Sequence, residues 1–337
     1  MSAYVLDSRR GKSRPAWADP IASELDLVER KLKSTVSSDV PVAFELAIHL
    51  FSAGGKRIRP TLVILSALAC GGGAAIDRAV GLAAAAELVH AASLVHDDVV
   101  DETTERRGVP TASAEWGNKI SVLGGDFLLA KGLTLLAADC DAEVLRIFSS
   151  AAVKMTESEM LQASSEGSLA AWEREYWRII DGKTAKFMSA CCEFGAVLSG
   201  AEPDARRAVV EYGQEIGLAF QITDDVLDLT GDPARTGKDI GTDLTHGKFT
   251  LPVLLALENL DGDDRKEMLS CIYEGLLSLE HAQRVAKLVI DCGAAEMARE
   301  VAMDHARKAC EQLVALPPSV YRDALETLAF SMTSREV

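Results

Sequence analysis

Apolar residues recur along most of this chain with the period of an α-helix. Near the N-terminus Ile21, Leu25 and Val28 follow one another at intervals of four and three residues, which places apolar side chains on one face of a helix. No segment sustains the alternation of apolar and polar residues that marks a half-exposed strand. The pattern predicts an all-α protein, with a loose polar tail over residues 1–19 and a single domain over residues 20–337.

Further helices are predicted wherever the apolar period continues. They cover residues 78–103, 124–137, 141–166, 171–198, 204–230, 250–260, 264–276, 280–314 and 319–332. Residues 54–60 are predicted to form a basic loop before an apolar helix, and residues 231–248 a loop rich in Gly, Asp and Lys. No repeat or low-complexity linker divides the chain, so a single helical bundle is the simplest prediction.

Composition and charge exclude some partners. Of the 337 residues 48% are apolar, and the net charge of −16 argues against a nucleic-acid partner, which calls for a basic surface. The seven cysteines are dispersed and lack the spacing of a metal site, so we expect reduced thiols in a cytoplasmic protein. The charged N-terminus has no apolar core of a signal peptide, and the uncharged stretch 60–76 is short and broken by glycines, so we expect no transmembrane segment.

Two matched clusters of aspartate are the strongest chemical signal in the chain. The first is Asp-Asp-Val-Val-Asp at 97–101 and the second is Asp-Asp-Val-Leu-Asp at 224–228. With about 100° of rotation per helical residue, the first and last aspartates of a cluster lie within about 40° of each other. Carboxylates stacked one turn apart repel each other, and magnesium, a hard cation that prefers oxygen ligands, relieves that repulsion.

The aspartates of both clusters are therefore predicted to be magnesium ligands. They are Asp97, Asp98, Asp101, Asp224, Asp225 and Asp228. Magnesium held by few carboxylates takes its other ligands from water and substrate phosphates, so the two clusters predict that the protein handles a metal-bound diphosphate. One cluster alone fits a solvated acidic helix face equally well, but two matched clusters favour the metal site. His90 and Gln221 share the helix faces of the first and second clusters.

Basic residues recur beside these clusters and next to glycine-rich turns. They are Lys56, Arg59, Arg106, Arg107, Lys183, Lys238 and Lys248. A guanidinium binds phosphate oxygens through two N–H groups at once, whereas a lysine acts as a mobile point charge. Taken singly, each residue fits an ordinary surface charge. Their placement as a set favours a phosphate site.

Seven segments occur in an order that matches a known family. They are Gly-Gly-Lys-Arg-Ile-Arg-Pro at 54–60, His-Asp-Asp-Val-Val-Asp at 96–101, Arg-Arg-Gly at 106–108, Gly-Asp-Phe-Leu-Leu at 125–129, Lys-Thr at 183–184, Phe-Gln-Ile-Thr-Asp-Asp-Val-Leu-Asp at 220–228 and Gly-Lys-Phe-Thr-Leu-Pro at 247–252. In these segments the chain resembles the trans-isoprenyl diphosphate synthases, or polyprenyl synthetase family. The resemblance implies a helical bundle around a deep central cavity, a homodimer, and condensation of isopentenyl diphosphate with an allylic diphosphate.

The resemblance also implies roles for individual residues, with the six aspartates binding three magnesium ions. The allylic diphosphate would be held by Arg106, Lys183, Lys238 and Lys248, and isopentenyl diphosphate by Gly55, Lys56, Arg59, His90 and Arg107. Lys183, Thr184 and Gln221 would be the catalytic residues, with the oxygens of Thr184 and Gln221 stabilising a developing allylic cation. Magnesium and the basic residues would stabilise the departing diphosphate, and a dry cavity would keep water from the cation.

The product is expected to be a long-chain all-trans polyprenyl diphosphate. Ala92 and Ser93 precede the first cluster, with Val89 one turn earlier. Short-chain members of the family commonly carry an aromatic residue at one of the first two positions, or two extra residues inside the first cluster. This chain has neither, so the resemblance favours an open tunnel. The alternative is that Ala92 and Ser93 only pack closely against a neighbouring helix.

Three other functions remain as alternatives. The first is a short-chain synthase that makes farnesyl or geranylgeranyl diphosphate. A terpene cyclase would normally carry a different second metal motif. A non-catalytic subunit that modulates a partner synthase tends to lose aspartates or basic anchors, and here all of them are present. An active synthase is therefore expected.

Overall fold

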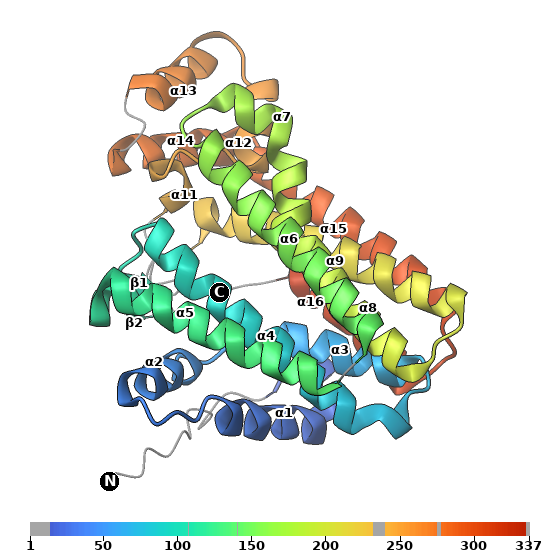
Figure 1. Ribbon diagram of the computed structural model, residues 1–337. Helices are drawn as coiled ribbons and strands as arrows, with labels where there is room; N and C mark the ends of the chain where they lie inside the picture. The colour runs from blue at the N-terminus through green and yellow to red at the C-terminus, as the bar shows by residue number, and fades with distance from the viewer. Residues whose placement is uncertain (1–13, 107, 140, 232–239, 275–277, 335–337) are drawn as a thin grey trace. The chain divides into compact units, whose positions relative to one another are not determined.

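The computed structural model of the protein is almost entirely helical (Figure 1). The structure describes residues 14–106, 108–139, 141–231, 240–274 and 278–334. Within these ranges the elements are helices, apart from one short two-stranded ladder. The all-α prediction is confirmed.

The chain packs as two compact units. The first comprises Met1–Arg146, Cys191–Arg206 and Leu316–Leu325, and the second Ile147–Ala190, Arg207–Ala315 and Glu326–Val337. The single domain over residues 20–337 and the central cavity both stay predictions.

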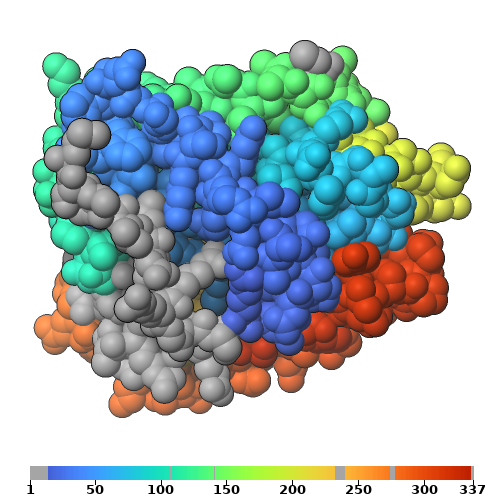
Figure 2. Space-filling model, turned by 90° about the horizontal axis from the view of Figure 1, so that it is seen from below, coloured from blue at the N-terminus to red at the C-terminus, as the bar shows by residue number. Residues whose placement is uncertain are grey.

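The first unit is built from the N-terminal helices. Its elements are η1 (Ala16–Ile21), α1 (Ala22–Thr35), α2 (Pro41–Ser52), α3 (Ile58–Ala69), η2 (Gly73–Ala75), α4 (Ile76–Val100), β1 (Glu105–Arg106), β2 (Val109–Pro110) and α5 (Ala112–Asp139). The helices α1 and α2 form part of the face in Figure 2, where they are blue. The helices α3 and α4 are buried on nearly all sides, as apolar sequences without a polar face require.

Small residues let α4 and α5 lie close together along their length, as Figure 1 shows. A Cβ atom built at Gly132 of α5 would lie 3.0 Å from Cγ2 of Val89 on α4. Another built at Gly125 would lie 2.3 Å from Nε2 of His96. Glycine at these two positions therefore sets the distance between the helix that carries the first aspartate cluster and its neighbour.

The predicted tail is too long by a few residues. The 3₁₀-helix η1 begins at Ala16, and Trp17 within it is only 3% exposed. An indole of this size buries a large apolar area, which anchors the segment to the core of the first unit. Residues 1–13 lie outside the described ranges.

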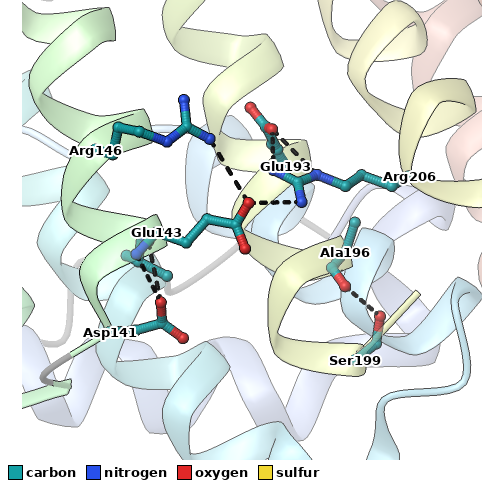
Figure 3. A network of polar contacts seen from close by, with 8 residues as sticks. Asp141, Glu143, Arg146, Glu193, Ala196, Ser199 and Arg206 are labelled. Atoms are coloured by element: carbon teal, nitrogen blue, oxygen red, sulfur yellow. Dashed lines mark hydrogen bonds and ion pairs between the residues drawn. The ribbon is translucent and has the colours of Figure 1, made fainter. Parts of the chain in front are cut away.

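An arginine bridge fastens later parts of the chain into the first unit (Figure 3). Arg206, near the start of α9 (Pro203–Thr230), lies 2.8 Å from Glu143 of α6 (Ala142–Ser165). It also lies 2.6 Å from Glu193 of α8 (Lys186–Ser199). One guanidinium therefore joins three helix segments.

The second unit contains a large apolar core of its own. Besides parts of α6, α8 and α9 it holds α7 (Leu169–Ile180), the π-helical segment η3 (Asp181–Ala185), α11 (Thr242–Thr245), α12 (Leu251–Asn259), α13 (Gly262–Glu274), α14 (Leu279–Asp291), α15 (Ala294–Gln312), η4 (Leu313–Ala315) and part of α16 (Val320–Thr333). Trp172, Tyr176 and Phe249 are the largest buried side chains in this core cluster. They come from α7 and from the segment before α12.

Several predicted elements differ in detail. The helix predicted over 124–137 begins earlier, as α5 (Ala112–Asp139), and α3 begins at Ile58, inside the loop predicted over 54–60. The helix predicted over 280–314 is two helices, because Gly293 adopts φ 79° between α14 and α15 and ends the first of them. The helix predicted over 171–198 is interrupted by the π-helical segment η3. The loop predicted over 231–248 contains the short helix α11.

Among the residues that the structure describes, two helical stretches are long and apolar enough to cross a membrane by length and composition, Gly73–Val100 and Ala112–Asp139. The most apolar part of the first is 67% buried inside the protein, as expected for a core helix, but that of the second is only 33% buried. None of the six cysteines that the structure describes is in a disulfide.

Candidate active site

The first aspartate motif lies at the C-terminal end of α4. Asp98 is 2% exposed, whereas its neighbours Asp97 and Asp101 are half-buried. Asp98 Oδ1 lies 2.8 Å from both Nε and Nη2 of Arg106. The buried middle carboxylate of this motif therefore has a cation beside it, and hydrogen bonds between charged groups are stronger than those between neutral ones.

A hairpin that the sequence analysis did not predict delivers Arg106. The strands β1 and β2 pair antiparallel just beyond α4, and Gly108 between them has φ 74°, which glycine adopts without strain. His49 of α2 holds the hairpin through a hydrogen bond from Nε2 to the carbonyl of Pro110 at 2.8 Å. The turn allows Arg106 to reach back to Asp98.

A pocket in the first unit connects the basic loop to this motif. Its empty volume is about 580 Å³, including open solvent. It is lined by His49, Leu50, Phe51, Ala53, Gly54, Arg57, Glu87, His90, Ala91, Leu94, Asp98, Arg106, Val109, Pro110 and Thr111. The predicted substrate residues His90 and Arg106 therefore share one pocket with Asp98. The predicted Gly55 is exposed next to Gly54.

The basic loop between α2 and α3 ends in an arginine with an unusual backbone. Arg57 has φ 53° and ψ 41°, a left-handed conformation that is rare outside glycine. Its Nε donates to Glu29 of α1 at 2.7 Å, and its Nη1 donates to Glu87 of α4 at 3.0 Å. On either side, Lys56 is exposed and Arg59 is 9% exposed. Sequence reasoning assigned no role to Arg57.

The second aspartate motif lies near the C-terminal end of α9, and its middle aspartate is also buried. Asp225 is 3% exposed, whereas Asp224 and Asp228 are half-buried. Asp225 Oδ2 accepts a hydrogen bond from the Tyr176 hydroxyl at 2.6 Å, and Oδ1 accepts one from Gln221 Nε2 at 3.0 Å. Both of these donors are neutral.

The hydrogen bonds continue to the predicted catalytic threonine. Thr184 Oγ1 donates to Gln221 Oε1 at 2.7 Å. Because the amide nitrogen of Gln221 donates to Asp225, both ends of the amide are engaged and its orientation is determined. Two of the three predicted catalytic residues are thus in direct contact and joined to the second motif.

Negative charge accumulates at the second motif. Burial, followed by the carboxylates of Asp243 and Asp224, raises the pKa of Asp225, and the hydrogen bonds from Tyr176 and Gln221 lower it; together they bring the pKa to about 7. Burial and then the charge of Asp225 raise the pKa of Tyr176 well above its ordinary value, so this phenol keeps its proton and donates it.

The predicted catalytic Lys183 lies in the π-helical segment η3. A Cβ atom at the preceding Gly182 would lie 1.9 Å from Ser158 Oγ of α6, so only glycine fits between the two helices. Lys183 Nζ lies 2.9 Å from Glu159 Oε1. Turns of this kind are frequent at functional sites. The catalytic role of Lys183 stays a prediction.

The segment that follows the second motif is fastened to it. The backbone N–H of Asp243 donates to Asp228 Oδ2 at 3.2 Å, and the N–H of Lys248 donates to the carbonyl of Asp243 at 2.9 Å. Lys248 is 6% exposed. The other two predicted phosphate ligands, Arg107 and Lys238, lie outside the described residues.

The three predicted chain-length residues lie on α4. Val89 and Ala92 are buried, and the half-buried Ser93 donates through Oγ to the carbonyl of His90 at 2.9 Å. None of the three lines the pocket of the first unit. Val89 packs closely against α5. The control of product length stays a prediction.

The aspartates fit magnesium by their chemistry. Within the described ranges no group of three or more His, Cys, Asp or Glu side chains is arranged to hold a metal ion. The donors of both motifs are nevertheless carboxylates, which hard cations such as magnesium prefer. Burial first, and then the carboxylates of Asp243 and Asp224, raise the pKa of Asp225, and a divalent cation beside it would favour the ionised form. Magnesium there would take its remaining ligands from phosphate and water, and the roles of the six aspartates as ligands stay predictions.

Three residues at these motifs escaped sequence reasoning. Arg57 belongs to the basic segment at 54–60, so a signal was present but pointed only to its neighbours. Tyr176 precedes Asp225 by 49 residues, and no spacing connects them. Asp243 follows the second motif in a segment predicted as loop.

Comparison with known proteins agrees with the motifs. Residues 40–289 match the polyprenyl synthetase family. The all-trans-nonaprenyl-diphosphate synthase (geranyl-diphosphate specific) of Rhodobacter capsulatus is 38% identical over 309 residues, covering 92% of this chain and 94% of that one. A short chain isoprenyl diphosphate synthase of Methanothermobacter thermautotrophicus is 36% identical over 316 residues, covering 92% and 96%.

A solved structure is similar over the whole chain. The polyprenyl synthase of Caulobacter crescentus, complexed with calcium and isoprenyl diphosphate, has a TM-score of 0.91 and 34% sequence identity, and covers 100% of both chains. The fold is thus that of the all-α isoprenoid synthases. The chain belongs to the polyprenyl synthetase family.

Proposed function

We propose that the protein is a prenyltransferase that condenses isopentenyl diphosphate with an allylic diphosphate and releases a long-chain all-trans polyprenyl diphosphate. The observation that carries the proposal is the pocket of the first unit, which Gly54, His90 and Arg106 line together with Asp98. Cationic and backbone donors beside an acidic motif suit a diphosphate and its metal ions. Family membership supports the same reaction.

Magnesium is the proposed metal, with three ions bound by the two motifs. The Caulobacter relative was crystallised with calcium and isoprenyl diphosphate, which supports a divalent cation and a prenyl diphosphate for this chain. When bound, the ions neutralise the charge that develops on the departing diphosphate. Arg106, Lys183, Lys238 and Lys248 are proposed to hold the same diphosphate.

The chain's own side chains position the reacting carbons. Thr184 donates its hydroxyl proton to Gln221, so the lone pairs of Thr184 Oγ1 remain available to an electron-poor allylic carbon. We propose that Lys56, Arg59 and His90 hold isopentenyl diphosphate with its double bond toward that carbon. A dry cavity prevents water from trapping the cation. After the new carbon–carbon bond forms, the resulting cation loses a proton to the diphosphate released from the allylic substrate, and this restores a double bond.

The long-chain product is proposed from Ala92 and Ser93, which place no aromatic ring before the first motif. The nonaprenyl synthase of Rhodobacter supports it. The short-chain synthase of Methanothermobacter supports the alternative, a farnesyl or geranylgeranyl product. Incubation with farnesyl diphosphate, radiolabelled isopentenyl diphosphate and magnesium, followed by dephosphorylation and chromatography, distinguishes them. We expect products longer than geranylgeraniol; absence of any labelled prenyl product would refute the prenyltransferase itself.

We also propose a homodimer formed through α5. This helix is apolar and exposes Val122, Leu123 and Leu133. A second copy of the chain would cover that face, whereas the net charge of −16 disfavours a membrane with anionic lipids. Sedimentation equilibrium should give twice the chain mass, and Leu123→Glu should give monomers. A monomeric wild type would refute the dimer. The dimer is proposed to work in the cytoplasm, where its thiols stay reduced.

A further inference from the structure

Arg57 combines a strained backbone with a buried, doubly bridged side chain. Its φ of 53° lies in the left-handed region, where side chains other than glycine are strained. Gly54 and Gly55 stand just before Lys56 and Arg57 in the chain, so glycine already occurs in this loop. An arginine at a position that suits glycine indicates that its side chain is required there.

The guanidinium joins the loop to two helices. It bonds Glu29 of α1 at 2.7 Å and Glu87 of α4 at 3.0 Å, and its Cζ lies 5.7 Å from the centre of the Phe51 ring of α2. Burial by itself lowers the pKa of Arg57, but the carboxylates of Glu87 and Glu29 outweigh it, so the pKa lies above its ordinary value. The side chain is a permanently charged bridge.

The bridge ends beside the residues proposed to bind isopentenyl diphosphate. Glu87 precedes His90 by three residues on α4, so the two side chains lie on neighbouring positions of one helix face. Both line the pocket, as does Arg57. At the other end, Arg57 lies between Lys56 and Arg59 and is the N-cap residue of α3.

We infer that Arg57 is a positioning residue that fixes the basic loop against the turn of α4 carrying His90, and so sets the spacing of the groups that hold isopentenyl diphosphate. This inference rests on the proposed function. Its Nε and Nη1 are bonded to carboxylates of α1 and α4, so in this proposal Arg57 acts by positioning Lys56 and His90 and not as a ligand itself. The allylic diphosphate is proposed to depend on other residues.

The test compares Arg57→Gly and Arg57→Lys with the wild type. Glycine keeps the left-handed backbone without the side chain, and lysine keeps the charge but has a single compact nitrogen in place of the planar fork whose separate nitrogens reach the two carboxylates. We expect KM for isopentenyl diphosphate to rise about tenfold or more in both variants, while kcat and KM for the allylic diphosphate change less than about threefold. A double-mutant cycle with Glu87→Ala should show that the two effects do not add.

Arg206→Lys is the matched control, because Arg206 also bridges two glutamates from two helices of the same unit (Figure 3) but does not line the pocket. It should leave both KM values unchanged. Circular dichroism and thermal unfolding confirm that each variant is folded.

Three results would overturn the inference. The first is a normal KM for isopentenyl diphosphate in either folded Arg57 variant. The second is an equal rise in Arg206→Lys. The third is failure of both Arg57 variants to fold, which would make the residue a determinant of stability alone. A wild type that forms no prenyl product would refute the proposed function instead, and calorimetric binding of isopentenyl diphosphate to the same variants would still decide the role of Arg57.

Discussion

The two aspartate motifs bury the same position, but the protein stabilises the buried carboxylate differently in each. In each motif the middle aspartate, Asp98 or Asp225, is nearly inaccessible, and its neighbours are half-buried. Asp98 lies against the guanidinium of Arg106, whereas Asp225 accepts hydrogen bonds from the neutral groups of Tyr176 and Gln221. The first motif thus brings a counter-charge from a nearby hairpin. The second depends on neutral donors.

The same sequence pattern therefore has two different electrostatic environments. A carboxylate paired with arginine is stable as an ion without any metal. Burial and the neighbouring Asp243 and Asp224 instead raise the pKa of Asp225 to about 7, so the charge at the second motif is poorly compensated by the protein. We therefore expect a divalent cation to stabilise the second motif more than the first.

The largest loss of activity is expected at the half-buried first aspartate of each motif, where the two motifs should behave alike. Asp97→Ala and Asp224→Ala should each lower kcat/KM by about 1,000-fold or more, because metal ions supply several kcal/mol of charge stabilisation. Both variants should stay folded by circular dichroism. Near-normal turnover in either variant would remove that motif from the site.

Arg106→Ala should reveal the charge pair of the first motif. It leaves the Asp98 carboxylate buried without its guanidinium, and we expect the free energy of unfolding to fall by about 2–4 kcal/mol. Urea denaturation without metal measures the change. Adding Asp98→Asn should recover part of the loss. If the single variant is as stable as the wild type, Asp98 does not depend on this pair.

Tyr176→Phe should have a smaller effect at the second motif. It removes one neutral donor from Asp225, for which about 1–2 kcal/mol of unfolding free energy is typical. The exposed Tyr273 of the same unit provides the control Tyr273→Phe, which should change little. A loss as large as that of Arg106→Ala would show that the two middle aspartates are held equally strongly.

The smallest change in the rate of condensation is expected for substitutions one helical turn before the aspartate motifs. The residues four positions before the first aspartates are Ser93 and Phe220, so only the first motif is preceded by a small residue. Ser93→Phe should shorten the product without changing the first condensation by more than about threefold. Ala91→Phe, which alters the pocket lining, should raise KM for isopentenyl diphosphate without shortening the product. Unchanged product length in Ser93→Phe would count against the tunnel.

Local periodicity made part of this arrangement predictable. The spacing of the aspartates places the outer two of each motif on one helix face, and α4 and α9 carry them near their C-terminal ends. The helices were predictable because their apolar period is continuous, as in α9. The break between α14 and α15 was also visible in the sequence, because Gly293 is a residue type that commonly ends helices.

The partners of the buried aspartates were not predictable, because they depend on contacts between distant segments. Tyr176 reaches Asp225 across 49 residues, and Arg106 reaches Asp98 only through a hairpin too short to show a strand pattern. In the π-helical segment that carries Lys183, Gly182 lies against α6, a contact that the local sequence does not reveal. Likewise, the glycines at 54 and 55 predicted a turn, but they did not predict that Arg57 would adopt a left-handed backbone conformation.

Metal-dependent binding of a diphosphate is the most direct test of the account. An allylic thiolodiphosphate, which cannot ionise readily, would be titrated calorimetrically into the wild type with magnesium and with EDTA. We predict binding only with magnesium, and loss of that binding in both Asp97→Ala and Asp224→Ala. Equal affinity in EDTA would contradict the claim that the two acidic motifs act through a metal-bound diphosphate.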